Sequence, residues 1–244
     1  INYEFFKNLG ADRAIEFVEA AGGQVTARLH DLTAKQVRGE ITQPLDRAGV
    51  GEGRLGIHRL SDELVRVTTG QPGIAATRIL FLNDNDKRIW RVDSDGAGLV
   101  AMSPGGVQVA SPAWAPDGAR FAYMQFSRDG TKPIVLQTVA TGTRTVLTTT
   151  DRSQNITPAF SPDGRSLIFA RMLDQGTALY GSNVLELCCE ERLTGGRFAE
   201  NLSPAYSPDG RRVAFVSTRA GGQQIYVMAA DGTEAMDHLK RRSF

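Results

Sequence analysis

The order of apolar and polar positions after residue 110 repeats with a fixed period. Each repeat contains a Pro-Ala-aromatic segment, then a Pro-Asp-Gly turn, then a run rich in β-branched and aromatic residues, and the copies begin at Ser111, Thr157 and Ser203. Successive copies are therefore 46 residues apart. A constant period in this range is typical of solenoids and propellers, because each unit buries its apolar faces only against its neighbours.

Each repeat predicts four antiparallel strands. In the turn, proline presets φ, aspartate hydrogen-bonds the backbone ahead of it and glycine accepts a positive φ. We expect second strands at 120–126, 166–170 and 212–216 and third strands at 134–139, 179–185 and 225–228, followed by a weak fourth strand. The turn residues are Pro116, Asp117, Gly118, Pro162, Asp163, Gly164, Pro208, Asp209 and Gly210. Four strands per period of about 45 residues define a propeller blade.

An earlier unit lacks the Pro-Asp-Gly opening but keeps the later strands. Residues 78–82 and 88–92 fit its second and third strands, and a Ser-Asp-Gly turn follows. We therefore expect about four blades in an incomplete ring, at approximately 77–110, 111–156, 157–202 and 203–244. The first of these blades is missing its inner strand.

The first 76 residues lack the repeat and predict a small α/β domain. Residues 2–9 form a short helix candidate that ends at Gly10, and 57–69 place Leu60, Leu64 and Val67 on one helical face. Residues 25–29 alternate and can pair with 36–41 as a hairpin. Residues 13–21 fit either a helix or a strand. The fold class is thus mixed, with an α/β domain at 1–76 followed by an all-β propeller at 77–244.

Composition and charge exclude several classes of function. The 28 basic and 27 acidic residues leave a net charge of +1, which offers no electrostatic footprint for nucleic acid or an anionic membrane. The longest aliphatic or aromatic run, residues 79–82, is far shorter than the roughly 20 residues of a membrane-spanning helix, so we expect a soluble chain. The chain begins at Ile1, which leaves a cleaved signal peptide open.

The sequence offers no constellation for catalysis, metal or cofactor binding. It has no G-x-S-x-G motif, and its three histidines, His30, His58 and His238, lie in separate elements. Residues 83–86 resemble the start of a calcium loop but lack its glycine and distal glutamate, so a solvated hairpin loop is favoured. Cys188 and Cys189 would point to opposite faces of a strand, which argues for a structural role and against a disulfide framework or zinc site.

Two sets of repeated residues admit a functional and a structural interpretation. The aspartates of the three turns could line a pore as a ring of carboxylates, but every copy of the turn needs an aspartate, so a turn role is favoured. Trp114, Phe160 and Tyr206 occupy equivalent positions. Packing between blades is favoured for them over stacking on a ligand.

The repeats resemble those of the TolB-type propeller family. The segment GIHRLSDELVRVTTGQPGIAATRILFL at 56–82 also resembles the helix and first propeller strand of that family, and residues 2–12 resemble a passage of its N-terminal domain. The resemblance favours a strand at 13–21. It implies a periplasmic, non-enzymatic scaffold of the Tol-Pal envelope system without a cofactor, whose propeller binds the peptidoglycan-associated lipoprotein and whose N-terminal region contacts an inner-membrane partner. Membrane association would come only through these partners.

The chain departs from the family pattern in its extent. Family propellers have six blades, whereas residues 77–244 hold fewer than four periods, and residues 237–244 lack the returning strand that completes the first blade. Because open blades expose strand edges, either further residues exist or a partner covers the gap. The second explanation favours an alternative role as a structural accessory subunit of a large membrane complex on its periplasmic side. A lyase or hydrolase that uses the propeller channel is a further, less favoured alternative.

A partner-binding surface is expected where loops join the blades and where loops join second to third strands. These loops carry residues of mixed charge, which suits a polar protein contact. The candidate partner-binding residues are Arg128, Asp129, Asn155, Arg171, Asp174, Asn201 and Arg219.

Overall fold

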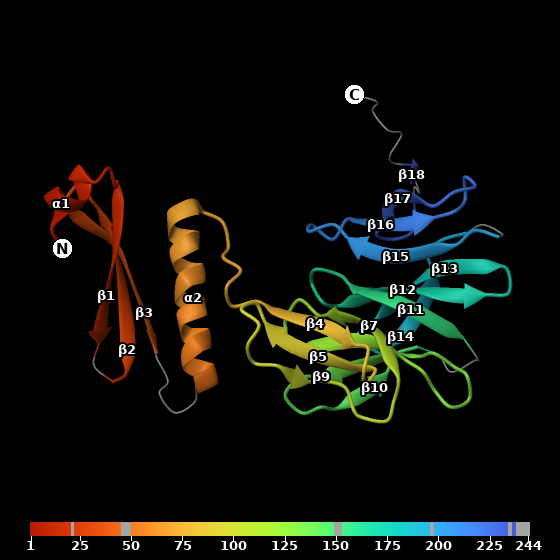
Figure 1. The fold of residues 1–244 in the computed structure, drawn as a ribbon. Helices are drawn as coiled ribbons and strands as arrows, with labels where there is room; N and C mark the ends of the chain where they lie inside the picture. Colours follow the sequence, from red (N-terminus) through yellow and green to blue (C-terminus); the bar gives the residue numbers. More distant parts are fainter. Residues whose placement is uncertain (21, 45–49, 149–152, 196–197, 234–235, 238–244) are drawn as a thin grey trace. The chain divides into compact units, whose positions relative to one another are not determined.

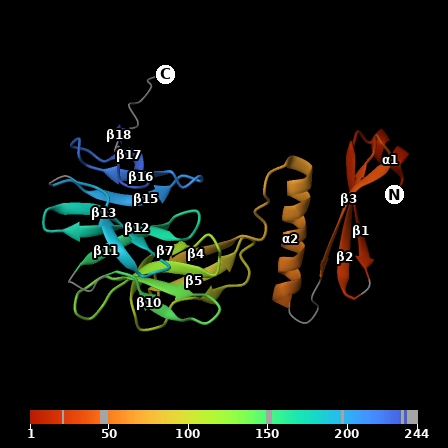
Figure 2. The same ribbon diagram turned by 180° about the vertical axis from the view of Figure 1, so that it is seen from behind.

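The computed structural model describes residues 1–20, 22–44, 50–148, 153–195, 198–233 and 236–237. The chain divides into two compact units, one of residues 1–79 and 92–99 and one of residues 80–91 and 100–244. Figures 1 and 2 show both units from opposite sides. No helix in the described part of the chain is long and apolar enough to span a membrane. His238 lies outside the described residues.

The first unit is a three-stranded antiparallel sheet with a long helix. Its elements are α1 (Tyr3–Asn8), β1 (Arg13–Ala20), β2 (Gln24–Asp31), β3 (Gln36–Pro44) and α2 (Val50–Thr69), with strand order β1-β2-β3. Buried Leu60 and Leu64 of α2 pack with Ala27 of β2, as the apolar face of the helix predicts. The short helix and the hairpin between β2 and β3 are confirmed.

Residues 13–20 form a strand, which settles the ambiguity left by the sequence. Every residue of β1 pairs with β2, from Arg13 opposite Asp31 to Ala20 opposite Gln24. The side chains of β1 alternate between exposed and half-buried, which is the period of two expected for a strand at the edge of a sheet.

Helix α2 begins at Val50, seven residues before the expected start at residue 57. Glycines at 51, 53 and 56 weaken the helical signal of this stretch because glycine is a poor helix former. The structure gives Gly56 a packing reason, since a Cβ there would lie 2.7 Å from the carbonyl oxygen of Pro44 at the end of β3. Close approach between helix and strand therefore overrides propensity.

A cluster of charges on α2 binds the turn at residues 92–99, which belongs to the same unit. The guanidinium of Arg54 donates to the carboxylates of both Asp93 and Asp95, and His58 Nε2 lies 3.0 Å from Asp95 Oδ2. Hydrogen bonding from Arg54, aided by the backbone N–H of Ala97, lowers the pKa of Asp95 from 3.8 to about 2.

Four successive antiparallel sheets, each a propeller blade, follow helix α2 along the chain. The first has three strands, β4 (Arg78–Asn83), β5 (Arg88–Asp93) and β6 (Val100–Ala101), and no described strand occupies the inner position beside β4. The other three blades have four strands each, in sequential order, and follow one another in Figures 1 and 2. Their strands are β7 (Val109–Trp114), β8 (Arg120–Gln125), β9 (Ile134–Thr138) and β10 (Arg144–Val146); β11 (Gln154–Phe160), β12 (Ser166–Leu173), β13 (Gly176–Asn183) and β14 (Cys188–Arg192); and β15 (Asn201–Tyr206), β16 (Arg212–Ser217), β17 (Gln224–Ala229) and β18 (Met236–Asp237).

The inner strands of the three full blades begin earlier than the Pro-Ala-aromatic segment predicts. Each contains a register shift against its neighbour, and the first residue of each repeat, Ser111, Thr157 or Ser203, has a positive φ at that shift. A bulge lets a strand continue past a residue that leaves the ladder. Each strand therefore extends two or three residues upstream of the repeat.

Aromatic side chains fill the interior of the blades. Phe169 is fully buried and stacks on Tyr180, with ring centroids 6.1 Å apart, and the equivalent pair in the last blade is Phe215 and Tyr226. The repeat aromatics Trp114, Phe160 and Tyr206 all pack against these apolar clusters. The structure thus gives them the packing role that the repeat favoured.

We expect Phe169→Ala to lower the free energy of unfolding by about 3–5 kcal/mol, because it deletes a fully buried ring and leaves a cavity. Urea denaturation followed by fluorescence measures the change. Phe198→Ala is the matched control, since that ring is 75% exposed and its loss should cost less than about 0.5 kcal/mol. Equal losses in the two variants would contradict the described core.

The lowered pKa of Asp95 predicts a contribution to stability that depends on pH. Because the folded pKa, about 2, is below the usual 3.8, the contribution is fully present above pH 3.8 and disappears as the pH falls toward 2. Urea midpoints measured from pH 6 to pH 2 should show Asp95→Asn less stable than the wild type at neutral pH, with the difference vanishing at the acid end. Asp84→Asn, which alters a carboxylate 88% exposed in a loop, controls for the loss of one charge. A difference that persists at pH 2 would contradict the assignment.

Candidate protein-binding face of the blades

The hairpin topology gives each full blade two distinct ends. The Pro-Asp-Gly turns lie at one end, and the loops between second and third strands lie at the other, beside the start of the next inner strand. A backbone hydrogen bond joins two blades at this second end, because the N–H of Asn155 donates to the carbonyl oxygen of Lys132 in the preceding blade (2.9 Å). Thr177 N–H donates to Ala199 in the equivalent place one blade later (3.0 Å). We call this the loop end.

Asn155 is fully buried and joins two blades at the loop end. Its Nδ2 donates to the carbonyl oxygen of Lys132 in the preceding blade (3.1 Å), and its Oδ1 accepts from Nε of Arg171 (2.8 Å). Arg171 in turn donates to Glu190 Oε2 (2.6 Å) and lies 4.5 Å from the ring centroid of Tyr180. The buried charge is therefore paired, hydrogen-bonded and stacked, as burial of a guanidinium requires.

Asn201 repeats this arrangement in the last blade. It is fully buried, its Nδ2 donates to the carbonyl of Thr177 (2.8 Å), and its Oδ1 accepts from Ser217 Oγ (2.9 Å) and Arg219 Nη2 (3.1 Å). The guanidinium of Arg219 lies over Tyr226, 4.7 Å from its centroid. The repeat position of Arg171 is occupied by Ser217 in this blade, because the two are 46 residues apart. The arginine of this blade, Arg219, comes two residues later.

These contacts correct the expected placement of three candidate residues. Asn155, Arg171 and Asn201 lie in strands β11, β12 and β15 and are buried, whereas the sequence placed them in loops. Polar residues at strand ends suggest solvent, but here their hydrogen bonds are satisfied internally. The structure brings Arg171 to Asn155 and Arg219 to Asn201. Arg128, Asp129, Asp174 and Arg219 are exposed at the loop end, and the partner-binding role of all seven residues stays a prediction.

Exposed apolar side chains share the loop end, and the sequence analysis did not single them out. Phe126 is 39% exposed beneath the ammonium of Lys132, Met172 and Leu173 end strand β12, and Phe198 is 75% exposed. A signal existed for three of them, because apolar residues follow the polar Gln125 and Arg171 that end the apolar runs of the second strands. Exposed apolar groups surrounded by charge are typical of protein interfaces.

The opposite end of the blades is a series of closed turns. Asp163 accepts from the Ser161 hydroxyl (2.6 Å) and the Arg165 N–H (3.0 Å), and these hydrogen bonds lower its pKa. Ser207 and the Arg211 N–H do the same for Asp209. The glycines that follow, Gly118, Gly164 and Gly210, have positive φ angles of 63°, 69° and 72°. These carboxylates are engaged in their own turns, as the turn interpretation requires.

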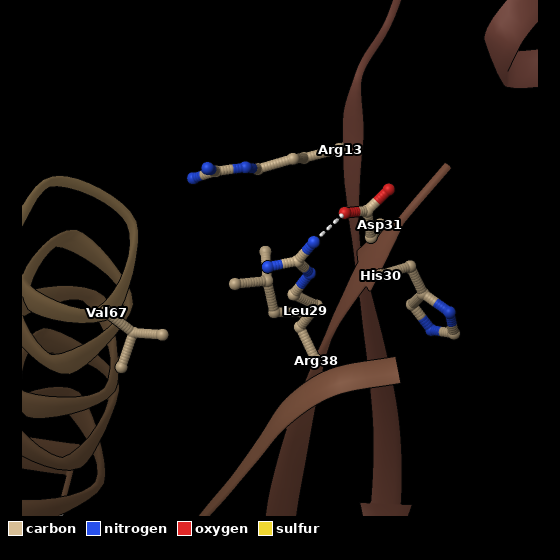
Figure 3. A pocket seen from close by; sticks show the side chains of 6 residues that line it. All are labelled: Arg13, Leu29, His30, Asp31, Arg38 and Val67. Atoms are coloured by element: carbon tan, nitrogen blue, oxygen red, sulfur yellow. Dashed lines mark ion pairs between the residues drawn. The ribbon is translucent and has the colours of Figure 1, made fainter. Parts of the chain in front are cut away.

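Two further features have the composition of small sites. Arg13, Arg38 and Val67 line a cavity of about 150 Å³ in the first unit. The two arginines come from the sheet, and Val67 comes from the helix that faces them (Figure 3). Arg38 is paired with Asp31 (2.8 Å), and Arg13 donates to the carbonyl of Thr68 (3.2 Å). The cavity is smaller than ordinary ligand pockets, which measure about 300–1,000 Å³.

The second feature corrects an expectation about the cysteines. Cys188 and Cys189 form a disulfide with each other, although neighbouring side chains of a regular strand point apart. Residues 83–86, by contrast, form a hairpin loop closed by their own side chains, with Asn83 accepting from Asn85 and Asp84 paired with Lys87.

Comparison with known proteins identifies the relatives of these blades. The family model described as the TolB beta propeller domain matches residues 65–240. Tol-Pal system protein TolB of Polaromonas sp. (strain JS666 / ATCC BAA-500) is 36% identical over 126 residues, which is 50% of this chain and 28% of that protein. The TolB of Azoarcus sp. (strain BH72) is 34% identical over 152 residues, 58% of this chain and 34% of that protein. The chain thus spans about a third or less of these relatives.

A solved structure extends the similarity to the whole chain. The crystal structure of TolB from Acinetobacter baumannii superposes with a TM-score of 0.76 at 26% sequence identity. The match covers 97% of this chain and 60% of that protein. The similarity therefore includes the α/β unit as well as the blades.

The buried asparagines predict a stability effect that a surface amide would not have. Asn201→Ala should lower the free energy of unfolding by about 1–3 kcal/mol, because the carbonyl of Thr177 and the guanidinium of Arg219 lose a buried partner. Urea denaturation measures the change. Asn85→Ala in the exposed β4–β5 loop is the matched control, and a loss there as large as that at Asn201 would contradict the blade-joining role.

Proposed function

The chain belongs to the TolB beta propeller domain family, and from this we propose that it is a non-enzymatic periplasmic scaffold that binds other envelope proteins through its propeller. The observation that carries the proposal is the structural match to TolB over both units. The curated relatives are named as proteins of the Tol-Pal system. Because the chain covers only part of their length, the partner itself is part of the proposal.

We assign the binding role to the loop end of the blades. That end combines exposed apolar side chains, Phe126, Met172, Leu173 and Phe198, with the exposed charges of Arg128, Asp129, Asp174 and Arg219. Apolar contacts at the centre of an interface supply most binding energy, and charges at its rim supply orientation and association rate. The proposed partner is the peptidoglycan-associated lipoprotein, as the family resemblance implies.

The buried network at the loop end supports this assignment. Arg171 and Arg219 are each stacked on aromatic rings and hydrogen-bonded to a buried asparagine, so the backbone that carries the exposed residues is held in place. A preorganised surface loses less conformational entropy when a partner binds. The face therefore suits a protein contact made without a large rearrangement.

The proposal assigns no catalytic step to the described residues. His30 is hydrogen-bonded to the Tyr3 hydroxyl (2.9 Å) and Glu16 (3.3 Å), and His58 is bonded to Asp95, so both imidazoles have structural partners. Neither lies beside a serine or cysteine nucleophile among those contacts. Hydrolase or lyase activity in the purified wild-type protein would overturn this part of the proposal.

The exposed ring of Phe198 provides the sharpest test of the binding face. We expect Phe198→Ala to weaken binding to purified peptidoglycan-associated lipoprotein at least about tenfold, which corresponds to about 1.4 kcal/mol. The substitution should leave folding unchanged because the ring is 75% exposed. Calorimetry or surface plasmon resonance measures the affinity. Arg128→Glu should have a smaller effect, of about 1 kcal/mol or less, that shrinks as salt is raised.

Matched controls lie at the other end of the blades. Leu185→Ala removes an apolar side chain that is 61% exposed in the β13–β14 turn, and Arg165→Glu reverses an exposed charge in a Pro-Asp-Gly turn. Both variants should bind as the wild type does. Equal losses at both ends would contradict the assigned face. Wild-type protein that ignores the lipoprotein but is recovered from membranes inside a large complex would replace the proposal with a role as a structural accessory subunit.

A further inference from the structure

The pair Cys188–Cys189 lies at the start of β14, directly after the tight turn that joins β13 to β14. The turn is held by Asn183, whose Oδ1 accepts from the N–H groups of Leu185 (2.9 Å) and Glu186 (3.0 Å). The carbonyl oxygen of Cys188 accepts from Ser182 Oγ (3.1 Å). Side chain and backbone bonds thus fix the segment that presents both sulfurs.

The local backbone explains why the two sulfurs meet. Leu187 and Cys189 have φ angles of 54° and 65°, and the pairing of β13 with β14 shifts register between Gly181 and Asn183. A left-handed residue at a bulge re-aims its side chain relative to a regular strand. Adjacent strand residues were expected to diverge, and this backbone removes the reason for excluding a shared site. Positive φ is uncommon for a residue with a Cβ and costs roughly 1–2 kcal/mol, so the surrounding turn has to hold Cys189 in this conformation.

A third donor lies within reach of the sulfurs. Glu186 Oε2 is 3.5 Å from Cys188 Sγ, and the ligand atoms of Glu186, Cys188 and Cys189 all lie within 4.8 Å of one another. No other group of three or more potential metal ligands occurs in the portion of the chain that the structure describes. All three donors come from four consecutive positions on one turn, so they move as a unit.

The site is open to solvent and to small reagents. Cys189 is exposed, and it lines a cavity of about 230 Å³ together with Asn183 and Glu191 of its own blade and Tyr206 and Asp231 of the next. An exposed disulfide can be attacked by an external thiolate, whereas a buried one is protected. A reductant and an ion therefore both have a path to the sulfurs.

We propose that Cys188, Cys189 and Glu186 form a Zn²⁺ site when the disulfide is reduced. Zn²⁺ is borderline-soft and accepts thiolate and carboxylate ligands, and three protein ligands with a water molecule in the fourth position complete its tetrahedral shell. Insertion of the ion between the sulfurs enlarges the ring that the disulfide closes by one atom. Oxidised protein, with both sulfurs bonded to each other, has no thiolate for the metal.

The switch between the two forms balances with a dithiol as the reductant. A dithiol thiolate attacks one sulfur of the pair, and its second thiol resolves the mixed disulfide. Two electrons and two protons pass to Cys188 and Cys189, and the reductant leaves as its own cyclic disulfide. Zn²⁺ then displaces the two thiol protons, so metal binding releases protons and strengthens as the pH rises.

The test compares oxidised and reduced protein in Zn²⁺ titrations. Thiol counting and intact mass establish the two forms, the dithiol is removed without oxygen, and Zn²⁺ is titrated against a chromophoric chelator. We expect reduced wild-type protein to bind one Zn²⁺ per chain and oxidised protein to bind none. Cys188→Ser and Cys189→Ser should each abolish binding, with circular dichroism to show that both variants are folded.

A matched pair of glutamate variants tests the third ligand. Glu186→Gln should weaken Zn²⁺ binding at least about tenfold in the reduced protein. Glu200→Gln removes the same charge from an exposed position outside both the donor cluster and the cavity, and should bind Zn²⁺ as the wild type does. Reduced wild-type protein that fails to bind Zn²⁺, or a Glu186→Gln variant with unchanged affinity, would overturn the proposal.

Discussion

A buried asparagine closes two of the three seams between adjacent blades in the described chain. A blade on its own has two apolar faces and a free inner edge, so it is stable only when its neighbours are held in register. Asn155 and Asn201 supply that register at one end, because each donates to a carbonyl of the preceding blade and accepts from a guanidinium of its own blade. The direction of these bonds fixes both the spacing of the blades and the position of the arginine that follows.

The same bonds connect the interior of the blades to their surface. Arg171 and Arg219 lie between the buried asparagines and the aromatic rings of Phe169, Tyr180, Phe215 and Tyr226. The charge of Arg171 is paired with Glu190 inside the fold, whereas Arg219 is anchored in the same way but stays exposed. The loop end presents to solvent the apolar side chains of Phe126, Met172, Leu173 and Phe198 together with exposed charges. A protein that contacts these side chains meets a surface whose support is already in place.

Local chemistry decides which parts of the molecule the sequence predicts. The turn at Pro162, Asp163 and Gly164 is readable because each residue acts within a few positions of itself, and the family resemblance follows from the repetition of such turns. The roles of Asn155 and Asn201 are not readable in this way, since their carbonyl partners lie 23 and 24 residues away in another blade. The sequence does not predict the early start of α2 or the pairing of the two cysteines for a related reason. Gly56 is required by the close approach of α2 to the end of β3. The orientation of Cys189 is set by a left-handed backbone that residues with a Cβ disfavour.

The two arginines reach equivalent places from different sequence positions. In one blade the guanidinium comes from within the second strand, and in the next it comes from two residues beyond that strand, while a serine occupies the original position. The arginine thus differs in repeat position between the two blades, while its hydrogen-bond acceptor and its aromatic neighbours occupy equivalent positions. The two blades therefore share the place of the guanidinium in space and not its position in the repeat. A comparison of blades by position alone would score this contact as lost where the molecule has kept it.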